Sequence, residues 1–156
     1  MTNSFRYNLM TILKVSDYMV ENPVTASPLA PVLLIARLMN DRQIGSIIIE
    51  KDMIPLGIIT ERDLVRRVIS EEKDVRKLIA WDICSKPVIT IGENMVIEDA
   101  VEIMVEHRIR RLVVVNRDGL VSGILTSNDI LHNFESFSKE KALDLVRMNR
   151  VLARTG

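Results

Sequence analysis

Hydrophobic positions along the chain follow the same succession of patterns twice. Continuous apolar runs at residues 47–49 and 112–115 predict strands that are buried on both faces. Before each run, apolar residues recur at helical spacing, which predicts one amphipathic helix ahead of each strand. The predicted inward faces of these two helices comprise Ile35, Leu38, Met39, Val96, Ala100, Ile103 and Met104.

Turn signals follow both apolar runs. Residues 116–119 read Asn-Arg-Asp-Gly, a strong hairpin signal, whereas the turn expected at residues 51–55 is weaker. A second strand follows each turn, and a second helix is predicted to begin near Asp63 and near Asp129. Each half of the chain therefore reads as strand, helix, two strands and helix.

The two halves also match residue by residue. Before the hairpins they align at a shift of 65 positions, and after them at a shift of 66. The clearest correspondence is the string Gly-apolar-apolar-Thr-x-x-Asp, which stands at residues 57–63 and again at residues 123–129. A string of seven positions that recurs in register indicates an internal repeat.

The repeat sets the predicted domain organisation. We expect an α/β fold of two β-α-β-β-α units, over residues 15–72 and 73–135, related by a pseudo-twofold axis with their sheets packed together. A unit of about 60 residues is marginal by itself, so the two share one module. The flanking residues 1–14 and 136–156 are predicted to hold short helices that pack on the module or form a dimer contact. Their apolar stripes comprise Phe5, Leu9, Ile12 and Leu13, and Ala142, Leu145, Met148 and Leu152.

The doubled string resembles the CBS motif, named after cystathionine β-synthase, over about residues 15–135. The resemblance implies two clefts that bind AMP, ADP, ATP or S-adenosylmethionine as a regulatory ligand, and an unidentified partner protein that the module regulates. It also implies a homodimer, because many such pairs assemble into a disc of four motifs. The sequence shows no nucleophile with a base, no paired carboxylates at a plausible site and no Gly-rich phosphate loop, so we do not expect an enzyme.

The resemblance also assigns site residues. Asp63 and Asp129 would grip the ribose hydroxyls, and Thr60 and Thr126 would lie beside the ribose and phosphate. The early strand of the opposite unit would line each adenine pocket. Those strands comprise Val24, Thr25 and Ala26 in the first unit and Ile89, Thr90 and Ile91 in the second. The sequence departs from the family pattern because neither unit has a basic-apolar-Pro-Val strand, and the first has Gly45 and Ser46 where a basic residue is usual.

Chemistry supports the same residues independently. A Thr-x-x-Asp string at a helix start is close to a capping box, so capping alone is one explanation. A carboxylate accepts hydrogen bonds only, and it therefore also suits two adjacent ribose hydroxyls. We expect Gly57 and Gly123 to let a ligand approach the backbone closely.

Two adjacent arginines are expected beside one of these sites. Folding the second hairpin about residues 116–119 places Arg111 opposite position 124, so Arg110 or Arg111 should lie beside Thr126 and hold phosphate. The other arginine should face away, because side chains alternate along a strand. Arg62 could supply charge to the first cleft. These arginines predict unequal clefts, with the one that holds Asp129 binding phosphorylated ligand more tightly.

Composition argues against several other classes of function. Basic and acidic residues balance at 21 each, and aromatic residues make up 4%, which disfavours a nucleic-acid binder built on Arg108, Arg110 and Arg111 and the basic tail. No apolar run is long enough for a membrane span. The single cysteine, Cys84, is expected to pack in the interior, and no metal-binding constellation is present. We expect a cytoplasmic protein, and an interaction scaffold with empty clefts remains the alternative.

Overall fold

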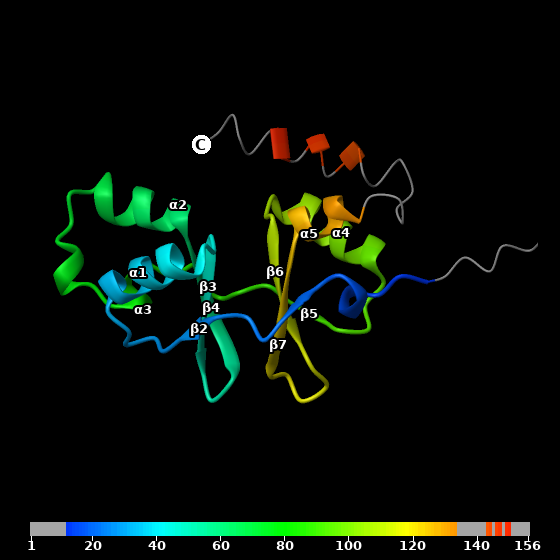
Figure 1. The fold of residues 1–156 in the computed structure, drawn as a ribbon, viewed down its shortest axis with the longest axis horizontal. Helices are drawn as coiled ribbons and strands as arrows, with labels where there is room; N and C mark the ends of the chain where they lie inside the picture. The colour runs from blue at the N-terminus through cyan, green and yellow to red at the C-terminus, as the bar shows by residue number, and fades with distance from the viewer. Residues whose placement is uncertain (1–11, 134–142, 145, 148, 151–156) are drawn as a thin grey trace, which may run out of the picture.

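The computed structural model describes residues 12–133 together with residues 143–144, 146–147 and 149–150 (Figure 1). The first unit contains η1 (Val15–Asp17), β1 (Val20–Glu21), β2 (Thr25–Ala26), α1 (Val32–Arg42), β3 (Ser46–Lys51), β4 (Ile54–Thr60), α2 (Glu61–Leu64) and the π-helical turn η2 (Val65–Ile69). The second contains η3 (Val75–Lys77), α3 (Ala80–Ile83), β5 (Thr90–Gly92), α4 (Ile97–His107), β6 (Arg111–Val115), β7 (Val121–Thr126) and α5 (Ser127–His132). The order of elements confirms the predicted α/β fold.

Two sheets lie at the centre of the molecule, with helices on their outer sides (Figure 1). One sheet has the strand order β2-β3-β4 and the other the order β1-β7-β6-β5. Within each sheet the early strand runs parallel to the next, as β2 does to β3 and β5 to β6, and an antiparallel hairpin follows. The repeat therefore folds twice into the same topology.

The leading segment of each unit packs on the opposite unit. In the first, Val20 of β1 pairs with Ile124 of β7, and in the second Ser85 forms the corresponding bridge to Ile58 of β4. The segments ahead of these contacts also correspond. The Val15 amide donates to the Met95 carbonyl at 2.9 Å, and the Ala80 amide donates to the Ala30 carbonyl at 2.8 Å. This exchange was not predicted from the sequence.

Two glycines leave the space through which the exchanged segments pass. A Cβ at Gly123 would lie 2.7 Å from Met19 Sδ and 3.0 Å from the Val20 carbonyl oxygen. A Cβ at Gly57 would lie 3.0 Å from both Cys84 Sγ and the Ser85 carbonyl oxygen. The expectation that these glycines admit a ligand is corrected, since the chain itself fills the space beside them.

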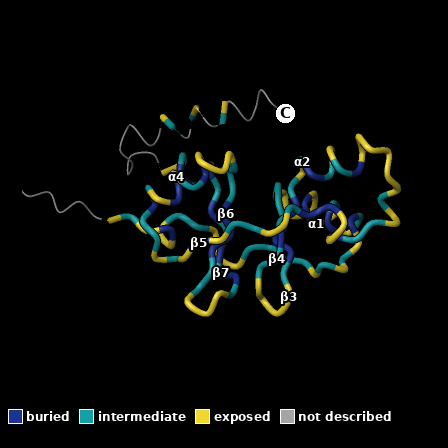
Figure 2. Tube along the Cα trace, turned by 180° about the vertical axis from the view of Figure 1, so that it is seen from behind, coloured by how far each residue is buried: buried dark blue, intermediate teal, exposed yellow. Residues whose placement is uncertain are grey.

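The exchange shares the apolar interior between the units. The core of the second unit includes Val15 from the first, and the core of the first includes Ala80, Ile83 and Cys84 from the second. A third cluster joins Ile48 of one sheet to Val113 and Val121 of the other. In Figure 2 the central strands are buried and the hairpin turns are exposed. Cys84 is buried in the core of the first unit, as expected, and this burial raises the pKa of its thiol.

The central strands form where the sequence predicted them, and the first hairpin turn differs from the prediction. The apolar runs form the central strands β3 and β6, and residues 47–49 and 112–114 are fully buried, as expected. The β3–β4 turn is tighter than expected, because Asp52 and Met53 both take positive φ, at 53° and 64°. This is the backbone of a type I′ hairpin turn.

Most of the flanking helices predicted from the sequence fall outside the described residues. Phe5, Leu9, Ala142, Leu145, Met148 and Leu152 lie there. Residues 12–14, in contrast, are described and not helical, and Lys14 instead forms a bridge to Val96. Within the described part of the chain, no helix is both long and apolar enough to cross a bilayer.

We predict that Gly57→Ala lowers the free energy of unfolding by about 1–3 kcal/mol, because the new methyl group must displace Cys84 or the Ser85 backbone. Gly92→Ala is the matched control, since no atom lies within 4 Å of a Cβ built there. Urea denaturation of the two variants measures both effects. Equal stability of the two would contradict the role assigned to Gly57.

Candidate functional site

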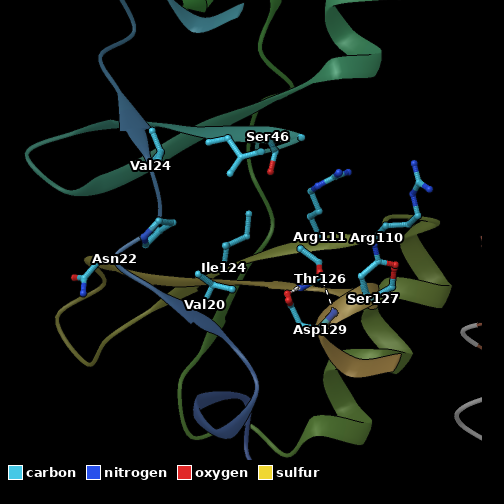
Figure 3. A pocket seen from close by; sticks show the side chains of 14 residues that line it. Val20, Asn22, Val24, Ser46, Arg110, Arg111, Ile124, Thr126, Ser127 and Asp129 are labelled. Carbon is cyan, nitrogen blue, oxygen red and sulfur yellow. Dashed lines mark hydrogen bonds between the residues drawn. The ribbon is translucent and has the colours of Figure 1, made fainter. Parts of the chain in front are cut away.

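The first of two clefts lies between the units at the start of α5, and we call it the Asp129 cleft (Figure 3). It encloses about 300 Å³, at the lower end of the range for small-molecule sites. The first unit contributes Val20, Asn22, Pro23, Val24, Ile44, Gly45 and Ser46. The second contributes Arg110, Arg111, Ile124, Thr126, Ser127, Asn128 and Asp129. Both units are therefore needed to form it.

Hydrogen bonds at the start of α5 hold the Asp129 side chain in place. Asp129 Oδ2 accepts hydrogen bonds from the Thr126 amide at 2.8 Å and from Thr126 Oγ1 at 2.6 Å, and the Asp129 amide donates back to Thr126 Oγ1 at 3.2 Å. This is the expected capping box. Asp129 Oδ1 has no hydrogen-bond or ion-pair partner among the residues that the structure describes. One carboxylate oxygen thus fixes the helix start and leaves the other available to a ligand.

The second cleft, which we call the Asp63 cleft, encloses about 250 Å³ at the corresponding position of the first unit. It is lined by Gly45, Ile58, Thr60, Glu61, Arg62, Asp63, Ser85, Arg108, Ile109, Arg110 and Arg111. Thr60 and Asp63 form the same capping box, with the Thr60 amide 2.8 Å from Asp63 Oδ2. Here, however, Arg67 Nε lies 3.6 Å from Asp63 Oδ1. Asp63 is also nearly buried, with 8% of its surface exposed.

The two arginines singled out from the sequence line both clefts. Arg111 pairs with Thr126 rather than with position 124, because the hairpin connection is longer than expected and a bulge follows Val114. Figure 3 shows Arg110 and Arg111 extending away from Asp129, toward the side on which Ser46 lies. Instead of one arginine facing the Asp129 cleft and one facing away, the pair stands between the two clefts.

Gly45 provides the room for Arg111 to reach the first unit. A Cβ at Gly45 would lie 2.8 Å from Arg111 Nη2 and 3.3 Å from Glu61 Oε2. Burial lowers the pKa of the Arg111 guanidinium, and the charge of Arg110 acts in the same direction, against the opposing effect of Glu61. Arg111 therefore carries a partly desolvated charge at the boundary of the two clefts, which a bound anion would stabilise.

The remaining predicted residues divide into two groups. Val24 lines the Asp129 cleft across from the second unit, as the resemblance implied. Thr25, Ala26, Ile89, Thr90 and Ile91 line neither cleft. Ile91 is buried in the core of the second unit, and Thr25 Oγ1 donates to Glu50 at 3.2 Å. The walls of the two clefts thus include residues that precede the predicted segments, Val20, Asn22 and Pro23 in one and Ser85 in the other.

Sequence reasoning missed the junction between the first helix and second strand of each unit. Ile44 lines the Asp129 cleft, and Ile109 and Arg108 line the Asp63 cleft. Gln43 and Arg108 end α1 and α4 with φ of 52° and 54°, a left-handed cap that turns the chain into the cleft wall. The matched positions of Ile44 and Ile109 in the repeat were the available signal.

Comparison with protein-family models gives a match to the CBS domain over residues 15–70 and 79–136. An uncharacterized protein of Methanopyrus kandleri is 44% identical over 124 residues, which are 78% of this chain and 63% of that protein. The chain thus spans less than two thirds of this relative. The CBS domain-containing protein YhcV of Bacillus subtilis is 30% identical over 119 residues, covering 76% of this chain and 84% of YhcV.

Solved structures share the fold. A conserved CBS domain protein of Thermoplasma acidophilum superposes with a TM-score of 0.77 at 22% identity, over 88% of this chain and 76% of that one. A CBS domain protein of Pyrobaculum aerophilum, solved in complex with AMP, gives a TM-score of 0.72 at 24% identity, over 86% of this chain and 99% of that one. At these identities the likeness establishes the fold alone.

We predict that Asp129→Ala and Asp82→Ala each lower the free energy of unfolding by about 0.5–2 kcal/mol, because each removes a carboxylate that caps a short helix. Asp82 Oδ2 accepts from the Ile79 amide at 2.9 Å at the start of α3, and Asp82 lies in neither cleft. Chemical denaturation gives both values. An unchanged stability of Asp129→Ala would show that the cap contributes nothing there.

Proposed function

The chain belongs to the CBS-domain family, and on that premise we propose that it is a regulatory module whose Asp129 cleft binds an adenosine nucleotide. The observation that carries the proposal is the pairing of an apolar wall from one unit with an available carboxylate oxygen from the other. Val20, Pro23 and Val24 form the wall, and Asp129 Oδ1 is the oxygen. A purine base suits the wall, and two ribose hydroxyls suit the carboxylate.

The position of the arginines supports a phosphorylated ligand. Arg110 and Arg111 line the same cleft, and a guanidinium is a fixed fork of donors that matches phosphate geometry. AMP is the first ligand to test, because a protein of this fold has been solved with it. ADP, ATP and S-adenosylmethionine are the other candidates.

The proposed regulatory effect follows from the composite cleft. A ligand that contacts Val24 of the first unit and Asp129 of the second binds best in one arrangement of the two units. Binding energy that depends on this arrangement shifts the population of module conformations. We propose that a separate partner protein senses this shift.

We predict that AMP binds the wild-type protein and that Asp129→Ala weakens it about tenfold or more, the loss expected for hydrogen bonds to a charged group. Isothermal titration calorimetry measures both affinities. Asp82→Ala is the matched control, since it loses a helix cap outside both clefts and should keep wild-type affinity. At 100 times its dissociation constant, AMP should also add about 2.7 kcal/mol of stability. Absence of binding by AMP, ADP, ATP and S-adenosylmethionine would refute the proposal.

We also propose that the chain forms a homodimer through the helices of the first unit. Leu34 of α1 and Val65 and Ile69 of η2 are exposed to 48%, 54% and 69%, although they are large and apolar. Exposed apolar side chains of this kind mark interaction surfaces when they lie together.

We predict that light scattering gives the mass of a dimer for the wild-type protein and that Ile69→Lys shifts it to the monomer, because a charge would be buried in the interface. Ile54→Lys is the control, because Ile54 is similarly exposed, at 52%, but lies at the β3–β4 turn. A monomeric wild-type protein at tens of micromolar, with and without AMP, would exclude the dimer.

A further inference from the structure

The Asp63 cleft differs from the Asp129 cleft in what it can bind, and we propose that it is an oxyanion site for phosphate or pyrophosphate groups rather than a second nucleoside site. The two clefts occupy equivalent places in a repeated fold, so each position of one can be compared with its counterpart in the other. Three structural differences lead to the proposal, and none of them requires that a nucleotide binds in the Asp129 cleft.

The apolar wall is largely missing from the Asp63 cleft. Val20, Pro23 and Val24 line the Asp129 cleft, but their counterparts do not form a similar surface. Ser85 replaces Val20 with a polar side chain. The counterparts of Pro23 and Val24 are Val88 and Ile89, which pack against the cluster between the sheets and against the core of the second unit. Ile58 and Ile109 are the apolar side chains that line the Asp63 cleft, and neither belongs to the segment that forms the wall of the Asp129 cleft.

The carboxylate that would hold a ribose has a cation beside it in this cleft. Arg67 Nε lies 3.6 Å from Asp63 Oδ1, and the same guanidinium donates to the Ile83 carbonyl at 2.6 Å and to Ser85 Oγ at 3.2 Å. These contacts hold Arg67 against Asp63 from behind the cleft wall. The counterpart of Arg67 in the second unit is Asn133, which donates to the Asp129 carbonyl oxygen and leaves the carboxylate alone. Asp63 therefore has an arginine beside its second oxygen, whereas Asp129 has no such partner among the described residues.

Arginines are more numerous in the Asp63 cleft: Arg110 and Arg111 line both clefts, but Arg62 and Arg108 line only this one. Arg108, Arg110 and Arg111 line the Asp63 cleft from the second unit. Their counterparts in the first unit are Gln43, Gly45 and Ser46. Arg62 adds a fourth arginine where the Asp129 cleft has Asn128.

The charge inside the Asp63 cleft is consequently positive. Four arginines line it against two carboxylates, Glu61 and Asp63, and Arg67 pairs with the second of these. Arg111 is partly buried, and among the described residues no carboxylate lies within ion-pair distance of its guanidinium. Several arginines lining one small cleft suit a phosphate group, because each guanidinium is a fork of donors that matches its oxygens. An oxyanion bound here would supply a counter-charge to Arg111.

Calorimetric titration of inorganic pyrophosphate into the full chain tests the proposal. We expect one pyrophosphate per chain, with affinity that falls as salt rises. Arg108→Gln should weaken it about tenfold or more, because Arg108 lines only this cleft. Arg117→Gln is the matched control, since it removes the same charge from the exposed β6–β7 turn and should leave the affinity unchanged.

A second pair of titrations separates the two sites. Arg108→Gln should leave AMP affinity unchanged, and Asp129→Ala should weaken AMP but not pyrophosphate. The proposal is overturned if pyrophosphate does not bind, if Arg117→Gln weakens it as much as Arg108→Gln does, or if Asp129→Ala weakens both ligands alike. Binding of two AMP molecules per chain would also overturn it. If AMP fails to bind while Arg108→Gln still removes pyrophosphate, the nucleotide proposal fails and the oxyanion site stands.

Discussion

The contact between each exchanged segment and a glycine of the opposite unit constrains most of this structure. Met19 and Val20 lie against Gly123, and Cys84 and Ser85 lie against Gly57, at distances that leave no room for a side chain. Because the segments cross reciprocally, neither unit can complete its own core or sheet without the other. The two units therefore form one module, although each has the length of a small domain.

The same exchange determines where the clefts lie and what they contain. After β1 crosses to pair with β7, the chain returns through residues 22–24 to β2, and this return passes over the start of α5. The wall of the Asp129 cleft is thus made of the connection between two strands that lie in different sheets. A molecule bound there touches the connection and the helix start at once, so ligand binding and the packing of the units are linked through the same residues.

The sequence predicted the elements better than the contacts between them. Apolar periodicity located α1, α4 and the central strands, because burial on one or both faces leaves a direct pattern in residue order. The Thr-x-x-Asp strings located both helix starts for the same local reason. The exchange was missed because Gly57 and Gly123 are compatible with a ligand, a bulge or a crossing strand, and only the fold distinguishes them. Arg111 does line the cleft of Asp129, as its place in the hairpin predicted, but its long side chain also lines the Asp63 cleft, which residue order along the strand could not indicate.

A comparison of the two clefts shows which residues the fold requires and which residues would serve only a ligand. Asp63 and Asp129 both cap a helix with nearly the same geometry, and the fold needs that cap in each unit whether or not anything binds. The doubled string therefore follows from the helix starts alone, and it cannot identify a binding site by itself. What distinguishes the clefts lies outside the shared positions of the string, in Arg67 against Asn133 and in Arg62 and Arg108, which line the Asp63 cleft but not the Asp129 cleft. Residues that break the symmetry of a repeated fold are not required by the repeat, and their chemistry is the better guide to what each cleft binds.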